Sequence, residues 1–445
     1  MNNVQPLVNK NEHKLGFWLS TSLVVGNMTG SGIFLLPAAL AVYGGISIFG
    51  WILTTIGAVL LALVFSRLSK LITKAGGPYA YSREGFGDFT GFLVVWGYWI
   101  SIWCGNAAIA VAGVGYLSIF FPTLKENSLL SVVTAIGTIW FFTFINTKNI
   151  RSVGKVQFII TILKIMPLLL FGTLGFLYFN SDHFLPLNLS DSSNFNAIIA
   201  SAALTLWAFL GLESTTIPSD KVINPTKTIP RATIAGTIIV ALIYISSTVA
   251  LMGIITPSNL RNSAAPFADA AQILWGNGLS YLVAIGAIIS CFGALNGWIL
   301  LQGQLPMAAA RDNLFPAEFK KVSKKGIPLI GIIISSVLSS ILVSMNYSKG
   351  LVQMFSFIIM LSTLTCLVPY LVSSLVEITL YLWKSERYQK KQLHIAILIS
   401  VPAFLYSLWA VIGLGYEIII WGIILLMIGI PVFVYIKISN RKKVR

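Results

Sequence analysis

The feature that most constrains this chain is a series of long apolar segments that continues from residue 16 almost to its end. We expect twelve membrane-spanning helices, at 16–43, 46–71, 87–121, 128–147, 153–179, 196–220, 231–256, 271–310, 327–345, 349–382, 392–414 and 416–438. Each range is close to or above the roughly 20 residues that a helix needs to cross a bilayer. Of the 445 residues, 56% are hydrophobic and only 10% are charged, so a water-soluble core could not hide the apolar surface. The sequence therefore predicts an all-α polytopic membrane protein.

Positive charge is distributed unevenly between the two sides of these spans. With the N-terminus inside, 26 of the 30 Lys and Arg residues fall on inside segments and three on outside loops, while Lys164 lies within a span. Because basic loops stay in the cytoplasm, this bias predicts that both termini are cytoplasmic, as tails over 1–15 and 439–445. It also accounts for the formal net charge of +16 without a nucleic-acid partner.

The first span is interrupted in its middle by glycine and polar residues, Gly26-Asn27-Met28-Thr29-Gly30-Ser31-Gly32. Glycine weakens a helix, and an unwound turn would leave backbone N–H and C=O groups at membrane depth, which is tolerable only beside a cavity or a ligand. The N-terminus of the following half-helix would suit a carboxylate. A packing seam of small residues is the alternative, because Gly26 and Gly30 have the G-x-x-x-G spacing.

A second interruption lies in the sixth span, Trp207-Ala208-Phe209-Leu210-Gly211-Leu212-Glu213-Ser214. The first and sixth spans occupy corresponding places in two halves of five helices. Paired interruptions at such places indicate a transporter site near the bilayer midplane, so we favour a binding site over a packing seam. The symmetry is inferred from position alone: a core over 16–382 with repeats at 16–179 and 196–382, followed by two helices over 392–438.

Several motifs resemble those of the amino acid–polyamine–organocation superfamily. They are Gly30-Ser31-Gly32-Ile33-Phe34, Gly76-Gly77-Pro78-Tyr79-Ala80-Tyr81, the sixth-span segment, and Asn224-Pro225 followed by Ile229-Pro230-Arg231-Ala232. Within it, the chain resembles the basic amino acid/polyamine antiporters over nearly its whole length, most closely those that exchange arginine for agmatine. The resemblance implies a LeuT-like inverted repeat of five plus five helices, with helices 1 and 6 broken and two helices added at the C-terminus. It also implies a bacterial inner-membrane location and electrogenic exchange, by alternating access, of an external basic amino acid for its internal decarboxylated amine.

The resemblance further implies which residues bind the substrate. Backbone N–H groups of Gly30, Ser31 and Gly32 would hold the carboxylate. Carbonyls near Met28 and Leu210 would take the α-amino group, and Trp298 would stack on the guanidinium. The other implied pocket residues are Asn27, Ser101, Ile102, Asn106, Ile109, Trp207 and Ser362. The family has other side chains where Met28, Ile102 and Ile109 stand, so ornithine/putrescine or lysine/cadaverine exchange stays open.

Two ionisable residues are expected within the membrane. Glu213 would form gates with Tyr98, Trp207 and Tyr370 and could exchange a proton as a gate moves, although a purely structural hydrogen-bonding role is the alternative. Lys164 could be a fixed or titrating cation, since some proton-coupled transporters of the superfamily carry a fifth-helix lysine where sodium-coupled relatives hold sodium. It therefore keeps a proton-coupled amino acid symporter open, and a lysine that snorkels to the interface is the rival interpretation.

Other classes of function find little support in the sequence. It lacks the G-x-x-x-x-G-K-[ST] pattern, so ATP-driven pumping is not expected, and neither are enzyme activity, a cofactor or a metal site. A passive channel and an amino acid-sensing receptor remain as alternatives, because flux without exchange or binding without flux would leave the same sequence pattern. The partners we expect are small-molecule substrates, the lipid bilayer, and a second copy bound through the C-terminal helices.

Overall fold

The computed structural model describes residues 15–30, 32–72, 76–148, 153–216, 222–324, 326–345, 348–383 and 392–444. Within these residues every regular element is a helix, and the remaining β-type contact is a single bridge between Leu15 and Val222. This agrees with the all-α class expected from the apolar pattern.

The helices follow the predicted order. The first five predicted spans contain α1 (Phe17–Met28), α2 (Gly32–Leu40), α3 (Ser47–Leu71), α5 (Asp88–Leu117), α7 (Ser128–Lys148) and α8 (Val153–Leu174). The next five contain α9 (Asn194–Leu206) with the 3-10 turn η4 (Trp207–Phe209), α10 (Pro225–Ile254), α13 (Asn277–Arg311), α14 (Leu329–Met345) and α15 (Leu351–Trp383). Then come α16 (Leu393–Gly413), α17 (Tyr416–Met427) and α18 (Gly429–Val444), while α4 (Pro78–Phe86), α6 (Thr123–Glu126), α11 (Pro257–Arg261) and α12 (Pro266–Trp275) are shorter.

These helices have the length and composition of membrane spans. Among the described residues, eight helical segments are long and apolar enough to cross a bilayer, and α1 with α2 forms a ninth that bends by 43°. Three shorter apolar helices, Lys164–Tyr178, Asn194–Phe209 and Leu329–Met345, lie in the other three predicted ranges. Large apolar side chains on the outer helices are exposed, for example Phe141 at 59% and Leu398 at 73%. Lipid must solvate these surfaces, so the prediction of a polytopic membrane protein is confirmed.

Two predicted ranges differ from the helices observed. The prediction of one span over 271–310 is wrong at its start, because residues up to Trp275 belong to α12 and α13 begins at Asn277. Gly276 separates them with a φ of 80°, a conformation that glycine adopts without strain. The range 196–220 is helical only as far as Phe209, and residues 210–216 form turns.

Each predicted span of the first half can be paired with the span five places later, so that α1 corresponds to α9, α3 to α10, α5 to α13 and α8 to α15. Contacts between helices are preserved when each helix is replaced by its counterpart. The helix α5 packs on α15, and the counterparts α13 and α8 also pack on each other. Likewise α10 contacts α1 and α8, as α3 contacts α9 and α15. Five crossings is an odd number, so the second half runs through the membrane in the opposite direction. The contacts therefore agree with the inverted repeat inferred from position.

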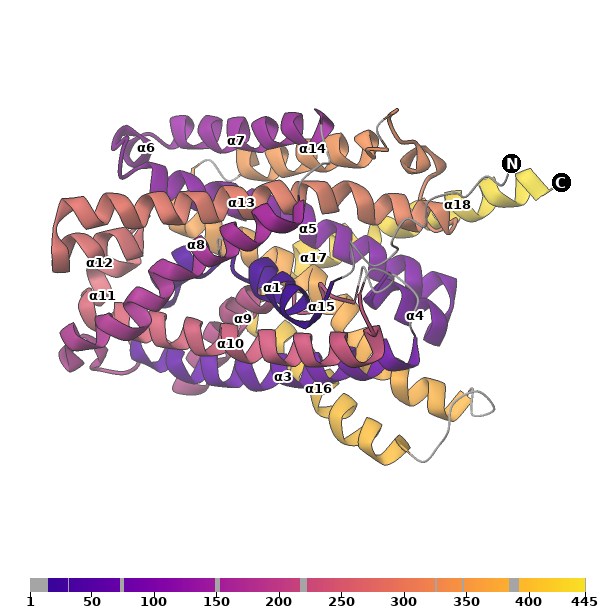
Figure 1. Cartoon of the computed structure of the whole chain (residues 1–445), viewed down its shortest axis with the longest axis horizontal. Helices are drawn as coiled ribbons and strands as arrows, with labels where there is room; N and C mark the ends of the chain where they lie inside the picture. Colours follow the sequence, from indigo (N-terminus) through magenta and orange to yellow (C-terminus); the bar gives the residue numbers. More distant parts are fainter. Residues whose placement is uncertain are drawn as a thin grey trace, which may run out of the picture.

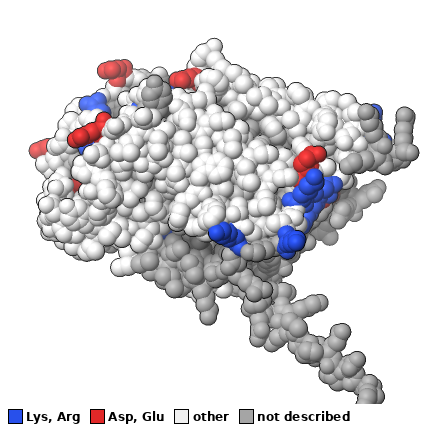
Figure 2. Space-filling model, turned by 90° about the horizontal axis from the view of Figure 1, so that it is seen from above, with Lys and Arg blue, Asp and Glu red and all other residues white. Residues whose placement is uncertain are grey.

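The long helices and the charged residues are arranged as expected for a protein that crosses a lipid bilayer. Figure 1 shows most long helices running roughly along the long axis, with α7 and α14 at one edge and α3 and α10 at the other. In the face drawn in Figure 2, the largest group of Lys and Arg lies toward one end, Asp and Glu lie mostly at the other end beside a few basic residues, and most of the middle is uncharged. The drawn face therefore has one more basic end and one more acidic end, separated by a mostly apolar middle.

Candidate functional site

The two helix breaks pack against each other in the interior of the fold. The first helix stops at Met28, where both the N–H and the hydroxyl of Thr29 donate to the Val25 carbonyl at 2.8 and 2.5 Å. In the second break, Gly211 has a φ of 103°, and a Cβ on it would stand 3.4 Å from Asn27. A left-handed turn of one broken segment therefore lies directly against the other, as in transporters with discontinuous helices.

A pocket lies beside these breaks, between the first span, α5, η4 and α13. The space free of atoms in and around it, including the part that is open to solvent, is about 450 Å³. Its lining consists of Asn27, Met28, Gly30, Gly32, Tyr98, Ser101, Ile102, Gly105, Ile109, Trp207, Leu210 and Trp298. No side chain with a formal charge is among these described lining residues, so the pocket is mostly apolar with a few neutral polar groups.

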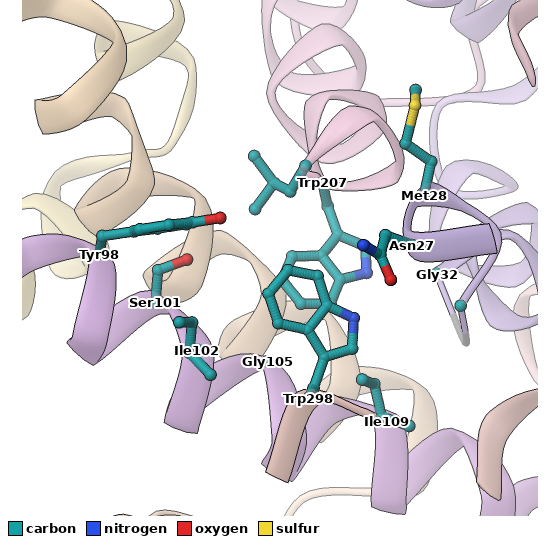
Figure 3. A pocket seen from close by; sticks show the side chains of 12 residues that line it. Asn27, Met28, Gly32, Tyr98, Ser101, Ile102, Gly105, Ile109, Trp207 and Trp298 are labelled. Carbon is teal, nitrogen blue, oxygen red and sulfur yellow. The ribbon is translucent and has the colours of Figure 1, made fainter. Parts of the chain in front are cut away.

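Aromatic rings dominate the pocket. Figure 3 shows the Trp207 and Trp298 rings in the middle, Tyr98 to one side, and Asn27, Met28 and Gly32 to the other. Two glycines let Trp207 come close: a Cβ on Gly32 would lie 2.7 Å from its Nε1, and one on Gly105 2.9 Å from its Cη2. Sequence reasoning missed Gly105, although it shares a helical face with Ser101 and Ile109.

Backbone groups of the first break already have local partners. The Met28 carbonyl accepts the N–H of Gly30 at 2.8 Å and the hydroxyl of Tyr244 at 2.8 Å. These two bonds use both lone pairs of the oxygen. The carboxylate- and amine-binding roles expected for Gly30 and Met28 therefore require these bonds to open, while Ser31 lies outside the described residues.

A buried carboxylate connects the second break to two long helices. Glu213 is fully buried, and Tyr98 on α5 donates its hydroxyl to one carboxylate oxygen while Tyr370 on α15 donates to the other at 2.8 Å. Tyr98 also lines the pocket and lies toward the end of α5 that adjoins α4. Three of the four predicted gate residues, Tyr98, Glu213 and Tyr370, thus form one cluster on that side of the pocket, while Trp207 lies within the pocket lining.

Comparison with known proteins decides the family. Residues 15–436 match the amino acid permease family. The cadaverine/lysine antiporter of Escherichia coli K12 is 36% identical over 369 residues, which cover 81% of this chain and 82% of the relative. This chain belongs to the amino acid permeases, in the group of basic amino acid/polyamine antiporters.

Two further relatives of this permease extend over nearly its whole length. The putrescine transporter PotE of Haemophilus influenzae is 33% identical over 94% of this chain and 95% of the relative. A Bacillus subtilis protein named "Putative arginine/ornithine antiporter" is 34% identical over 97% of this chain and 98% of the relative. The names of the three relatives give different substrates: cadaverine and lysine, putrescine, and arginine and ornithine.

Two residues expected in the substrate site of the permease lie behind the pocket lining. Ser362 donates its hydroxyl to the Ser101 carbonyl at 2.7 Å, and Asn106 donates its amide to the Gln302 side chain at 2.6 Å. Both side chains are fully buried and engaged with the helices around them. Sequence reasoning missed Gln302, although a buried glutamine four residues after Trp298 lies on the same face of α13.

Lys164 of the permease lies on α8, away from the pocket lining but against the first break. Its ammonium donates to the Gly26 carbonyl at 3.4 Å, and the side chain is fully buried. No ion pair of Lys164 is found among the described residues. The lysine therefore does not snorkel to an interface, and it faces the carbonyl end of the first half-helix.

Proposed function

We propose that this permease exchanges an external basic amino acid for the internal amine formed by its decarboxylation, and that arginine is its preferred amino acid. The observation that carries the proposal is a pocket that presents two tryptophan rings beside a helix break and, among its described lining residues, no charged side chain. Such a pocket suits both substrates of the exchange. Each has a cationic group at its distal end, and at the other end the amino acid carries a carboxylate where the amine carries a hydrogen. The roles of Gly30, Ser31 and Gly32 toward the carboxylate and of Met28 and Leu210 toward the amino group belong to this proposal.

Arginine is favoured by the chemistry of its side chain. A planar guanidinium stacks on an indole, and a cation over a tryptophan ring gains roughly 0.5–2 kcal/mol. The guanidinium keeps its charge at any relevant pH. A neutral pocket lets the substrate leave again, which an exchanger requires. The names of the relatives support lysine/cadaverine and ornithine/putrescine as the pairs to compare with it.

The proposal includes a gate, an orientation and an assembly. Tyr98, Trp207, Glu213 and Tyr370 would open and close the pocket by alternating access. Both termini would lie in the cytoplasm of a bacterium, with the chain in the inner membrane, because the basic end of Figure 2 is the cytoplasmic type of surface. The homodimer through the C-terminal helices, expected from the sequence analysis, also belongs to this proposal.

The test uses purified protein in liposomes. Labelled arginine, lysine or ornithine is added outside vesicles that contain agmatine, cadaverine, putrescine or buffer alone. We expect uptake only when an amine or a basic amino acid is inside, and fastest with the arginine and agmatine pair. Equal uptake into empty vesicles would indicate a channel, and binding without uptake would indicate a receptor.

Proton-coupled symport is the second candidate, and Lys164 is the observation that favours it. A buried ammonium that contacts the Gly26 carbonyl can stabilise the first break in the way a bound cation would. Symport predicts uptake of labelled amino acid into empty liposomes when a proton gradient is imposed, and loss of this uptake in Lys164→Met. Uptake that needs an internal amine in both proteins would exclude symport.

A further inference from the structure

Two buried amides form a pair directly behind the lining of the pocket. Asn106 on α5 donates its Nδ2 to Oε1 of Gln302 on α13, at 2.6 Å, and both side chains are fully buried. Asn106 lies four residues after Ile102, and Gln302 lies four residues after Trp298. Residues with this spacing share a helix face, so the pair lies next to two residues that line the pocket.

The orientation of the Gln302 amide is determined by its other contacts. Its Nε2 lies 3.1 Å from the Ile332 carbonyl and 2.9 Å from the Ser336 hydroxyl. A backbone carbonyl can only accept, so the atom that faces Ile332 must be the nitrogen. Oxygen Oε1 of Gln302 therefore faces Asn106. The Asn106 side chain must direct its NH₂ group toward this oxygen, because a flipped Asn106 amide would bring two oxygens to 2.6 Å.

This arrangement leaves one acceptor unpaired. The Oδ1 of Asn106 is buried and has no hydrogen-bond partner in the described part of the chain. An unpaired buried acceptor is costly and uncommon, and in a transporter a ligand is one way to satisfy it. A cationic substrate brings the N–H donors that this oxygen lacks.

We propose that Gln302 is a positioning residue that sets the substrate preference of the pocket. It holds the Asn106 amide so that the oxygen is the unpaired end, and this oxygen accepts an N–H from the distal cationic group of the substrate. The inference rests on the proposed function, since it assumes a basic amino acid or its amine in the pocket. A site built to hydrogen-bond a substrate N–H discriminates strongly against an analogue without one.

The experiment compares cationic substrates with norleucine, which has an apolar side chain and no distal donor. Uptake of labelled arginine or lysine is measured at increasing concentrations of norleucine, in the parent and in Gln302→Met, which keeps a similar length and volume. We expect the preference for the cation to fall at least about tenfold, the effect of one charge-assisted hydrogen bond. Gln304→Leu, on another face of α13, is the matched control and keeps the parental preference.

Two further variants separate positioning from a structural role. Gln302→Glu, with its buried carboxyl protonated, still presents an oxygen to Asn106 and a hydroxyl donor to the Ile332 carbonyl, so it should keep the preference that Gln302→Met loses. In an Asn106→Leu background, Gln302→Met should change the preference no further, because Gln302 acts through Asn106. Melting temperature and gel filtration check that each variant folds.

Two results would overturn the role proposed for Gln302. An unchanged preference in Gln302→Met, with slower uptake of every substrate, would assign Gln302 a structural role and overturn the inference. Independent effects in the double variant would overturn it as well. If the parent carries neither arginine nor lysine, the proposed function fails first and this inference falls with it.

Discussion

At the scale of single residues, the site combines neutral recognition with one buried carboxylate. Glu213 does not line the pocket, yet it accepts hydroxyls from two tyrosines on different helices, and one of these tyrosines does line it. A movement of Tyr98 therefore changes the number of donors around the carboxylate. A carboxylate whose hydrogen bonds change during a cycle can take up or release a proton during that cycle.

The variant Glu213→Gln tests this coupling. Glutamine fills the same space and still accepts one phenol, but it cannot ionise, so we expect the pH dependence of exchange to flatten. The measurement is the initial rate of arginine uptake into agmatine-loaded liposomes across a range of pH. Glu126→Gln, an exposed carboxylate on α6, serves as the control and should keep the parental profile. A parental profile in Glu213→Gln would assign Glu213 a purely structural role.

Trp298 is the residue that we expect to contact the substrate cation. Replacing it by leucine removes the ring and keeps an apolar side chain, so the KM for arginine should rise about 2- to 30-fold, which corresponds to 0.5–2 kcal/mol. Trp140→Leu on the exposed face of α7 should leave the KM unchanged. Uptake kinetics with equal amounts of reconstituted protein measure both values, and an unchanged KM in Trp298→Leu would remove this role.

At the scale of elements, the sequence could locate the breaks but could not supply their internal bonding. Glycine and polar residues in an apolar span are visible in the sequence, which is why Gly26–Gly32 and Leu210–Glu213 could be predicted as interruptions. The hydroxyl of Tyr244 on the Met28 carbonyl and the pairing of Asn106 with Gln302 join residues far apart in the chain. Such contacts depend on how helices pack, and no local pattern in the sequence records them.

Gly211 offers a test of the second break. Its φ of 103° is a conformation that side chains adopt only under strain, about 1–3 kcal/mol, whereas a Cβ at 3.4 Å from Asn27 makes an ordinary contact. Gly211→Ala should therefore lower the melting temperature and slow exchange through backbone strain alone. Gly137→Ala on α7, where a Cβ would meet nothing within 4 Å, should be neutral or slightly stabilising. Equal melting temperatures in the two variants would contradict this account.

At the scale of the whole molecule, the apolar pattern predicted the class and the order of the helices. It worked because twelve apolar segments and polar loops leave few other ways to satisfy a bilayer. The pattern failed at 271–310, where α12 and α13 are both apolar and only the backbone of Gly276 separates them. The lining residues other than Gly105 were expected from the family resemblance, and periodicity alone would not have distinguished them from other buried positions.

Exchange of arginine for agmatine predicts an electrical signal. Arginine enters with one positive charge and agmatine leaves with two, so each cycle moves one positive charge outward. An inside-negative potential, set by a potassium gradient and valinomycin, should slow arginine uptake into agmatine-loaded liposomes. Exchange of arginine for arginine moves no net charge and should not respond. A heteroexchange that ignores the potential would require a compensating ion and would rule out the proposed stoichiometry.

The two glycines that contact Trp207 also limit how the substrate specificity of such a pocket can change during evolution. At positions 32 and 105 even a methyl group would collide with the ring, so these positions have almost no room to vary. Positions 28, 102 and 109 carry flexible or branched aliphatic side chains on the same pocket, and exchanges among them alter its depth by a carbon or two. A lineage that shifts between cations of different length would therefore be expected to drift at the aliphatic positions while the glycines stay fixed.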